Sequence, residues 1–147
     1  MIYSLFKLAQ GEYIAPDKIE RIICRNPYIA QVYVEGSSLK SSLVAIIVPD
    51  REALIPWARQ ESILHDSFEE LCDDPRVKKF LMEQIIGLGS MGTQELKGFE
   101  VPKAIHVEAK EFTQVNGLLT PTLKFKRETA KKIYEKQIGK MYARLKE

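Results

Sequence analysis

Three cationic side chains occur close together in the segment 116–127, namely Lys124, Lys126 and Arg127. The segment contains an Asn-Gly pair and a proline, which predicts a long loop that leads into a helix. A lysine in that loop can place a compact ammonium against a phosphate or a carboxylate and offset the negative charge that develops in phosphate chemistry. A solvated, basic helix start explains the same pattern and is favoured by spacing alone, although cations there oppose the helix dipole slightly.

A second segment with chemical potential, 6–16, surrounds Gly11. A glycine between an extended stretch and a helix that starts with proline permits a tight turn and the close approach of another molecule. An ordinary hairpin turn that leads into a helix explains the same residues, and spacing alone favours that interpretation. Neither segment identifies a reaction by itself.

The remaining reactive side chains do not form a recognisable site. Neither His65 nor His106 has a second metal-binding side chain at ligand spacing, so we predict no metal site. Cys24 lies among isoleucines, and we expect it to be a buried small apolar group. With Cys72 it makes only two cysteines, too few for a disulfide-built scaffold and suited to a reducing compartment.

Composition places the chain among ordinary soluble domains. With 147 residues, 45% of them hydrophobic and 29% charged, we expect one domain that spans 1–147. The net charge of +2 is too balanced for a dedicated nucleic-acid binder, and no apolar run approaches the roughly 20 residues of a membrane span. The charge is uneven, because residues 124–147 contain nine Lys and Arg and three Glu. We expect this basic tail to be solvated; contact with an anionic membrane or with the phosphate of a ligand is the competing interpretation.

Hydrophobic spacing and turn signals predict a small α+β domain in which two or three mostly antiparallel strands are flanked by helices. The first helix starts at Pro16, and the strands 30–35 and 42–48 form an antiparallel pair of which the second is covered on both faces. A third strand covers 104–109.

Capping residues predict the starts of the other helices. Asp50 caps a helix that Pro56 breaks or kinks, Ser67 begins a capping box with Glu70, and Asp74 caps a helix that starts with proline. The last helix begins near residue 128, with either Ile133 or Tyr134 at the start of its apolar stripe, and the segment 111–127 before it is a loop.

Considered together, these segments resemble the C-terminal domain of long-chain fatty-acid–CoA ligases, within the adenylate-forming or AMP-binding superfamily. FKLAQGEYIAPDKIE at 6–20 is similar to the family's signature after its interdomain hinge, and NGLLTPTLKFKR at 116–127 is similar to its terminal lysine segment. The intervening IAQVYVEGSSLKSSLVAIIVPD at 29–50 and SFEELCDDPRVKKFLMEQI at 67–85 also resemble the family. The resemblance therefore covers almost the whole chain in the expected order.

The resemblance implies two separate roles. Lys124 matches the lysine that contacts ATP and the fatty-acid carboxylate during formation of the acyl-adenylate, with Lys126 and Arg127 as candidates for anion contact. Gly11, together with Lys7, Gln10 and Glu12, matches the loop that turns toward the CoA channel for thioester formation. In this family the small domain rotates between the two half-reactions, so the two segments act in turn.

The resemblance also implies what the complete enzyme uses. Its substrates are a fatty acid, ATP and CoA, with Mg²⁺, and the partner of this chain is the large N-terminal AMP-binding domain. The stretch 1–4 does not match the family's hinge, and the large domain is missing, so we expect the isolated chain to be inactive and to bind none of these ligands tightly. We expect an intracellular, soluble domain whose parent enzyme associates with the cytosolic face of endoplasmic reticulum, mitochondrial or peroxisomal membranes. The alternative is a stand-alone, non-catalytic module that docks on a partner or a membrane.

Overall fold

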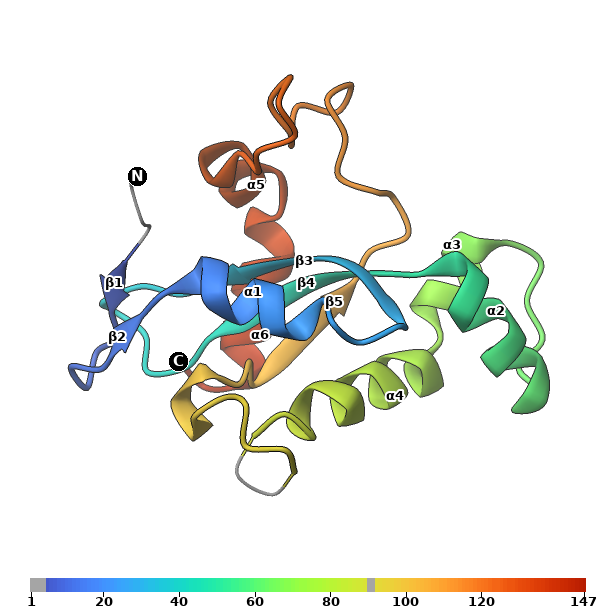
Figure 1. Cartoon of the computed structure of the whole chain (residues 1–147), viewed down its shortest axis with the longest axis horizontal. Coiled ribbons are helices and arrows are strands. Elements are labelled where there is room, and N and C mark those ends of the chain that lie inside the picture. The colour runs from blue at the N-terminus through green and yellow to red at the C-terminus, as the bar shows by residue number, and fades with distance from the viewer. Residues whose placement is uncertain (1–4, 90–91) are drawn as a thin grey trace.

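Three strands form the central sheet in the computed structural model of the chain, which describes residues 5–89 and 92–147 (Figure 1). β3 (Ile29–Glu35) lies antiparallel to β4 (Val44–Pro49), and β4 lies parallel to β5 (Ala104–Val107). β4 is the central strand, and all of its residues are buried. This confirms the antiparallel pair and the covered second strand that the sequence predicts, although the third strand ends two residues earlier than expected.

A two-stranded hairpin and seven helical segments accompany the central sheet within the described residues. The hairpin consists of β1 (Phe6–Lys7) and β2 (Tyr13–Ile14), which pair antiparallel. The helices are α1 (Pro16–Ile23), α2 (Arg51–Gln60), α3 (Phe68–Asp73), α4 (Pro75–Ile86), the short 3₁₀ helix η1 (Gly98–Glu100), α5 (Arg127–Ile133) and α6 (Glu135–Arg144).

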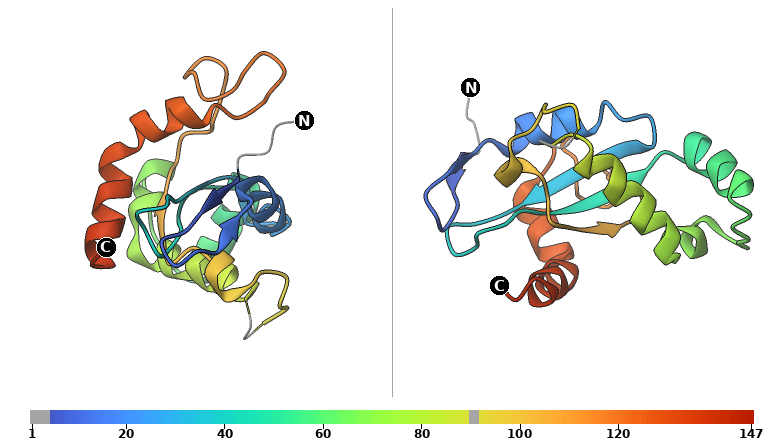
Figure 2. Two further views of the ribbon diagram at one scale, coloured as in Figure 1. Left: turned by 90° about the vertical axis from the view of Figure 1, so that its left-hand side faces the viewer. Right: turned by 90° about the horizontal axis from the view of Figure 1, so that it is seen from below.

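The two faces of the sheet support two separate cores, because successive side chains of a strand point to opposite sides. On one face, Ala45 and Ile47 of β4 belong to a core that α1 to α4 complete. On the other face, Val44 and Ile46 belong to a core with residues of α5, α6 and the segment 112–125. Figure 2 shows α1 and α6 on opposite sides of the sheet. The elements form the α+β arrangement that the sequence predicts.

The predicted helix caps are present. The side chain of Asp50 accepts a hydrogen bond from the amide of Ala53, that of Ser67 from Glu70, and that of Asp74 from Arg76. The capping box is only half formed, because the Glu70 carboxylate accepts from the amide of Asp66 (3.2 Å) instead of that of Ser67.

Two predicted helices differ in detail from the structure. Of the two effects predicted for Pro56, a break is wrong, because α2 continues to Gln60. Because proline has no N–H, the carbonyl of Glu52 lacks its usual hydrogen-bond donor at position 56. Both residues are exposed, so water can hydrogen-bond to that carbonyl. The final helix is divided at Tyr134, whose backbone (φ −100°, ψ 16°) separates α5 from α6. Of the two alternatives for its apolar stripe, Tyr134 is buried whereas Ile133 is exposed.

The prediction that Cys24 is buried is also wrong. Cys24 is exposed and lies just after the last residue of α1. Ile22 and Ile23 face the core, and the next residue is turned by about 100° around the helix axis, away from it. Partial burial, and to a smaller extent the nearby Glu20 carboxylate, raise the pKa of the Cys24 thiol to about 11, so the thiol is not activated.

Candidate functional site

The lysine loop, residues 116–126, projects from the sheet at the top of Figure 1 and ends where α5 begins. Its tip is a tight turn in which the amide of Lys124 donates to Thr120 Oγ1 (3.0 Å) and the amide of Thr120 donates to the Lys124 carbonyl (2.8 Å). Leu123 inside the turn has φ 66°, a left-handed conformation. At the base of the turn, Leu119 and Phe125 form an isolated β-bridge. The backbone of Lys124 therefore has a defined position.

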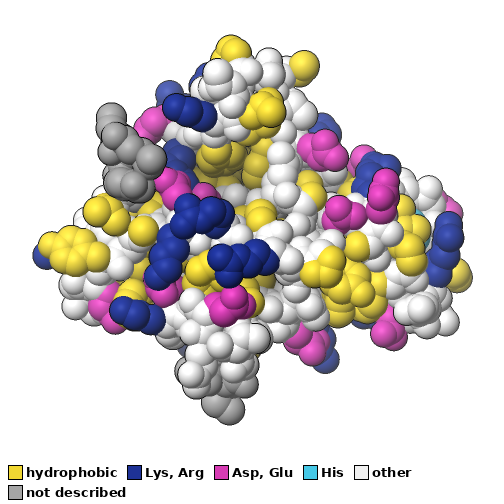
Figure 3. Space-filling view, viewed as in Figure 1, with side chains coloured by type: hydrophobic (Ala, Val, Ile, Leu, Met, Phe, Trp, Pro, Cys, Tyr) yellow, Lys and Arg dark blue, Asp and Glu magenta, His cyan; other side chains and the backbone are white. Residues whose placement is uncertain are grey.

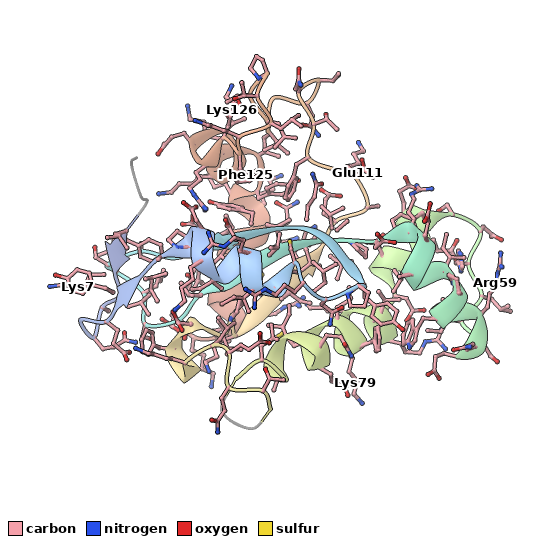
Figure 4. The ribbon with its side chains drawn as sticks, in the orientation of Figure 1. Lys7, Arg59, Lys79, Glu111, Phe125 and Lys126 are labelled. Carbon is pink, nitrogen blue, oxygen red and sulfur yellow. The ribbon has the colours of Figure 1, made fainter. Side chains whose placement is uncertain are left out.

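An aromatic cluster connects this loop to the sheet. The ring centroid of Phe125 lies 5.2 Å from that of Tyr33 on β3 and 5.1 Å from that of Phe112. Phe112 in turn lies 6.2 Å from Tyr134. Figure 4 shows Phe125 on the side of the loop that faces the sheet, and Lys126 further out. The apolar residue between the two lysines thus fixes the loop while its neighbours reach solvent.

The three cations that the sequence singles out have different surroundings. Lys124 and Lys126 are exposed, and within 5–89 and 92–147 neither ammonium forms an ion pair. Arg127 is half-buried, and its Nη2 lies 2.5 Å from Asp17 Oδ1 and 2.5 Å from Glu20 Oε1. Arg127 therefore has carboxylate partners within the chain, whereas the two lysines are available to an external anion.

A broad depression of about 1000 Å³ lies beside these residues. Lys124, Lys126 and Arg127 line it together with Phe6 of β1 and Glu20 of α1. In Figure 3 this face of the molecule is hollowed beneath the uppermost loop, with hydrophobic side chains inside and charges of both signs nearby. The depression can accept a group that is partly apolar and partly anionic.

Burial dominates the electrostatics around the depression. Burial raises the pKa of the Glu20 carboxyl, although its hydrogen bond and charge interaction with Arg127 act in the opposite direction. Burial also raises the pKa of the Tyr33 hydroxyl, which donates a short hydrogen bond to Glu35. The Tyr33 hydroxyl is therefore protonated at neutral pH.

The other predicted segment forms the hairpin turn. Gly11 has φ 98°, a conformation that side chains disfavour, and its amide donates to the Leu8 carbonyl (2.8 Å). Gln10 Nε2 donates both to Glu12 Oε1 (3.0 Å) and to the Ser41 carbonyl (3.0 Å). The turn is therefore tied to the segment that connects β3 and β4.

The two predicted segments meet only at Phe6 and Pro16, which line the depression with Lys124, whereas the predicted loop residues Lys7, Gln10, Gly11 and Glu12 are not among its lining residues. Lys7 lies near the tip of the hairpin, with its ammonium 5.0 Å from the centre of the Tyr13 ring. Figure 4 shows Lys7 at one end of the molecule and Lys126 on the projecting loop. The expected hinge position, residues 1–4, lies outside the described residues.

Sequence reasoning missed Asp17, Glu20 and Thr120. Glu20 carried a usable signal, because it is a charged residue next to Ile19 and two positions before Ile22 on a short amphipathic helix. A buried carboxylate needs a partner. Nothing in the local pattern identifies that partner as Arg127.

Residues 5–89 and 92–147 contain neither a candidate membrane span nor a candidate metal cluster. None of the helices in those ranges is both long enough and apolar enough to cross a membrane. Nor do His, Cys, Asp and Glu side chains there form a group of three or more that could hold a metal ion.

Comparisons with known proteins show which proteins this chain is related to. No family model matches the chain. The peroxisomal long chain acyl-CoA synthetase 7 of Arabidopsis thaliana is 44% identical over 97% of this chain, and long-chain-fatty-acid–CoA ligase 1 of Homo sapiens is 46% identical over 97%. The chain spans about 20% of the length of each of these relatives.

Two solved structures have folds similar to that of this chain. The A domain of carboxylic acid reductase from Segniliparus rugosus, in complex with AMP and a co-purified carboxylic acid, superposes with a TM-score of 0.78 at 30% identity, over 96% of this chain and 20% of that one. An acyl-CoA synthetase from Brucella canis shares the fold with a TM-score of 0.54 at 16% identity, over 91% of this chain and 20% of that one. The chain is therefore a homologue of the C-terminal region of long-chain fatty-acid–CoA ligases and has the fold of the matching part of adenylate-forming enzymes.

Proposed function

We propose that this chain acts as the C-terminal lid domain of a long-chain fatty-acid–CoA ligase, in which a fatty acid, ATP and CoA give acyl-CoA, AMP and pyrophosphate. One observation carries the proposal. In a chain whose relatives are 42–46% identical ligases, the Lys124 ammonium is exposed on a conformationally defined turn and has no ion-pair partner in the described ranges. A free cation on a fixed backbone is what stabilisation of a developing negative charge requires.

In the first half-reaction Lys124 lies opposite the nucleotide pocket of the large domain. Its ammonium neutralises charge as the fatty-acid carboxylate attacks the α-phosphate and pyrophosphate leaves. Lys126, which is also exposed, contacts an outer phosphate oxygen, whereas Arg127 would have to exchange its carboxylates for an anion. Mg²⁺ accompanies ATP in the complete enzyme, and we assign no residue of this chain to it.

In the second half-reaction the lid rotates and presents the hairpin turn to the CoA channel. Gly11 gives the pantetheine chain a surface without a side chain, and among the described residues other than its chain neighbours no heavy atom lies within 4 Å of the position that a Cβ would take there. Gln10 and Glu12 hold the turn, and Lys7 flanks it. The physical separation of this turn from Lys124 suits residues that act in turn.

Joining this chain to the large domain of human long-chain-fatty-acid–CoA ligase 1 tests the proposal. We expect acyl-CoA formation by the joined protein and none by either part alone. Turnover by the isolated chain would contradict the requirement for the large domain. Inactivity of the joined protein, under conditions in which the large domain with its own C-terminal region is active, would contradict the proposed role itself.

A second candidate function is a stand-alone module that docks on a membrane or on a partner. It is favoured by the exposed cations of the basic tail, among them Lys132 and Lys136 of α5 and α6, and by the exposed side chain of Ile133. This module would bind vesicles containing anionic lipid in a salt-dependent manner. Absence of binding at low salt would eliminate the membrane-docking form of this module, and with it membrane contact of the parent enzyme through this surface at the endoplasmic reticulum, mitochondria or peroxisomes.

A further inference from the structure

Arg127 connects the end of the lysine loop to α1. It is the first residue of α5, and both terminal nitrogens of its guanidinium contact Glu20. Nη2 lies 2.5 Å from Oε1, and Nη1 lies 3.0 Å from Oε2. Nη2 also lies 2.5 Å from Asp17 Oδ1. Asp17 and Glu20 are three positions apart on α1 and therefore project from the same side of the helix. The pairing is bidentate, and this geometry restricts the orientation of the arginine side chain most strongly.

The same cluster includes the backbone of β3. Glu20 Oε2 accepts a hydrogen bond from the amide of Val34 at 2.8 Å, and Arg127 Nη1 lies 3.5 Å from the Val34 carbonyl oxygen. β3 is an edge strand of the central sheet, so these backbone groups have no neighbouring strand on that side. One arginine and one glutamate thus join α1, β3 and the start of α5.

Such a cluster is an inefficient way to stabilise a fold. The side chains of Glu20 and Arg127 are only 15% and 23% exposed, so the charges have lost much of their hydration. Replacing a buried ion pair by apolar residues of similar size is often neutral or stabilising. A bidentate pair does, however, define the position and the orientation of the groups that it joins.

We propose that Asp17 and Glu20 are positioning residues for Lys124, which they orient by holding Arg127 at the end of the lysine loop. Lys124 lies between two fixed points, the Thr120 turn before it and the Arg127 anchor after it. The guanidinium therefore serves the loop and does not bind the substrate phosphates. The predicted effect on catalysis rests on the proposed function, whereas the predicted anchoring of the lysine loop does not.

Hydrogen exchange in this chain tests the positioning directly. The amide of Lys126 donates to the Leu118 carbonyl at 2.8 Å, and that of Lys124 to Thr120 Oγ1, so both amides report on the loop. In Glu20→Gln and in Arg127→Gln we expect both amides to exchange about tenfold faster, because the loop opens locally without its anchor. Arg21→Gln is the matched control, since Arg21 is exposed on the same helix and has no ion pair in the described ranges; we expect no change in it.

Amides of the central strand separate positioning from general stability. If the anchor acts on the loop, amides of β4 such as that of Ile46 keep their exchange rates while those of the loop change. Equal acceleration in β4 and in the loop would mean global destabilisation and would overturn the proposal, as would unchanged loop amides. Asp17→Asn, at a more exposed position (48%), is a milder variant that serves if the other two fail to fold.

Kinetics of the joined enzyme give a second, independent test. A positioning role predicts that Glu20→Gln, Asp17→Asn and Arg127→Gln lower kcat of adenylate formation by about tenfold to a hundredfold, with little change in KM for ATP. A rise in KM for ATP in Arg127→Gln alone would assign Arg127 to the phosphates and overturn the proposal. If the joined enzyme is inactive even without substitutions, the proposed function fails, and hydrogen exchange still decides whether the anchor holds the loop.

Discussion

Phe125, the residue directly after Lys124, packs against Tyr33, and the two ring centroids lie 5.2 Å apart. Tyr33 belongs to β3, so this contact fixes the residue next to the candidate catalytic lysine relative to a strand of the central sheet. The lysine loop lacks helix and strand apart from one isolated bridge, and side-chain packing supplies the order that a regular element would otherwise give.

Phe125→Ala should loosen the lysine loop. Because Phe125 is only partly buried, we expect the free energy of unfolding to fall by about 1–2 kcal/mol, measured by urea denaturation. Leu123→Ala is the matched control, since Leu123 is 66% exposed in the same loop and should change stability by less than about 0.5 kcal/mol. Equal losses in the two variants would show that the aromatic contact has no special role.

Lys124→Met should separate the two half-reactions in the joined enzyme. We expect adenylate formation to slow by about 10²–10³-fold, the usual cost of removing one group that stabilises transition-state charge. Thioester formation from supplied acyl-adenylate should change little. Lys132→Met, on the exposed side of α5, should leave both rates unchanged. Equal losses of both half-reactions in Lys124→Met would count against its assignment to the first.

Gly36→Ala should disturb the contact between the hairpin and the sheet. A Cβ at this position would lie 2.6 Å from Leu43 Cδ2 and 2.8 Å from Phe6 Cε2, so both side chains would have to move. We expect a loss of about 1–3 kcal/mol in the free energy of unfolding, as for other overpacked sites. In the control Gly98→Ala, a Cβ meets no atom of the described residues beyond its chain neighbours within 4 Å, and we expect a change below about 0.5 kcal/mol. Similar effects of the two substitutions would refute the steric argument.

His106 should make stability fall in mild acid. Burial lowers the pKa of this imidazole, an effect that the nearby Glu108 carboxylate opposes. As the pH falls below about 6.5, the unfolded chain takes up a proton that the folded chain resists, so the free energy of unfolding decreases until the lowered pKa is passed. We expect a smaller decrease in His106→Gln. A proton NMR titration that places the pKa of His106 at or above its ordinary value would contradict this prediction.

Glu147 should hold the segment between β3 and β4 down to unusually low pH. Its carboxylate accepts hydrogen bonds from the amide (2.6 Å) and from the hydroxyl (2.7 Å) of Ser41. Side-chain hydrogen bonds with Ser42 and with Ser41 lower the pKa of Glu147. The stabilisation is therefore complete above the ordinary pKa of a glutamate and is lost as the pH falls through the lowered value.

The amide resonance of Ser41 reports this titration. We expect its midpoint to lie below about 4.3, the pKa of an unperturbed glutamate, and to be absent in Glu147→Gln. Because Gln10 donates to the Ser41 carbonyl, the side-chain amide of Gln10 should shift with the same midpoint. A midpoint at or above the ordinary glutamate value would mean that the contact does not persist in solution.

The sequence by itself predicted the elements whose signals are local. Ser67 and Asp74 are polar residues directly before helices, and a cap acts on amides only two or three residues away. The run 43–48 is apolar at successive positions, which is typical of a strand covered on both faces. The family likewise followed from contiguous segments at 6–20 and 116–127, and the comparisons confirmed it.

Tertiary structure alone decided the partners of the candidate site. Arg127 and Glu20 are separated by 107 residues, and they meet because α1 and the start of α5 both lie beside the edge of β3. Caps and periodicity are set by backbone geometry over a few residues, whereas an ion pair across the chain exists only after the sheet and its helices have assembled.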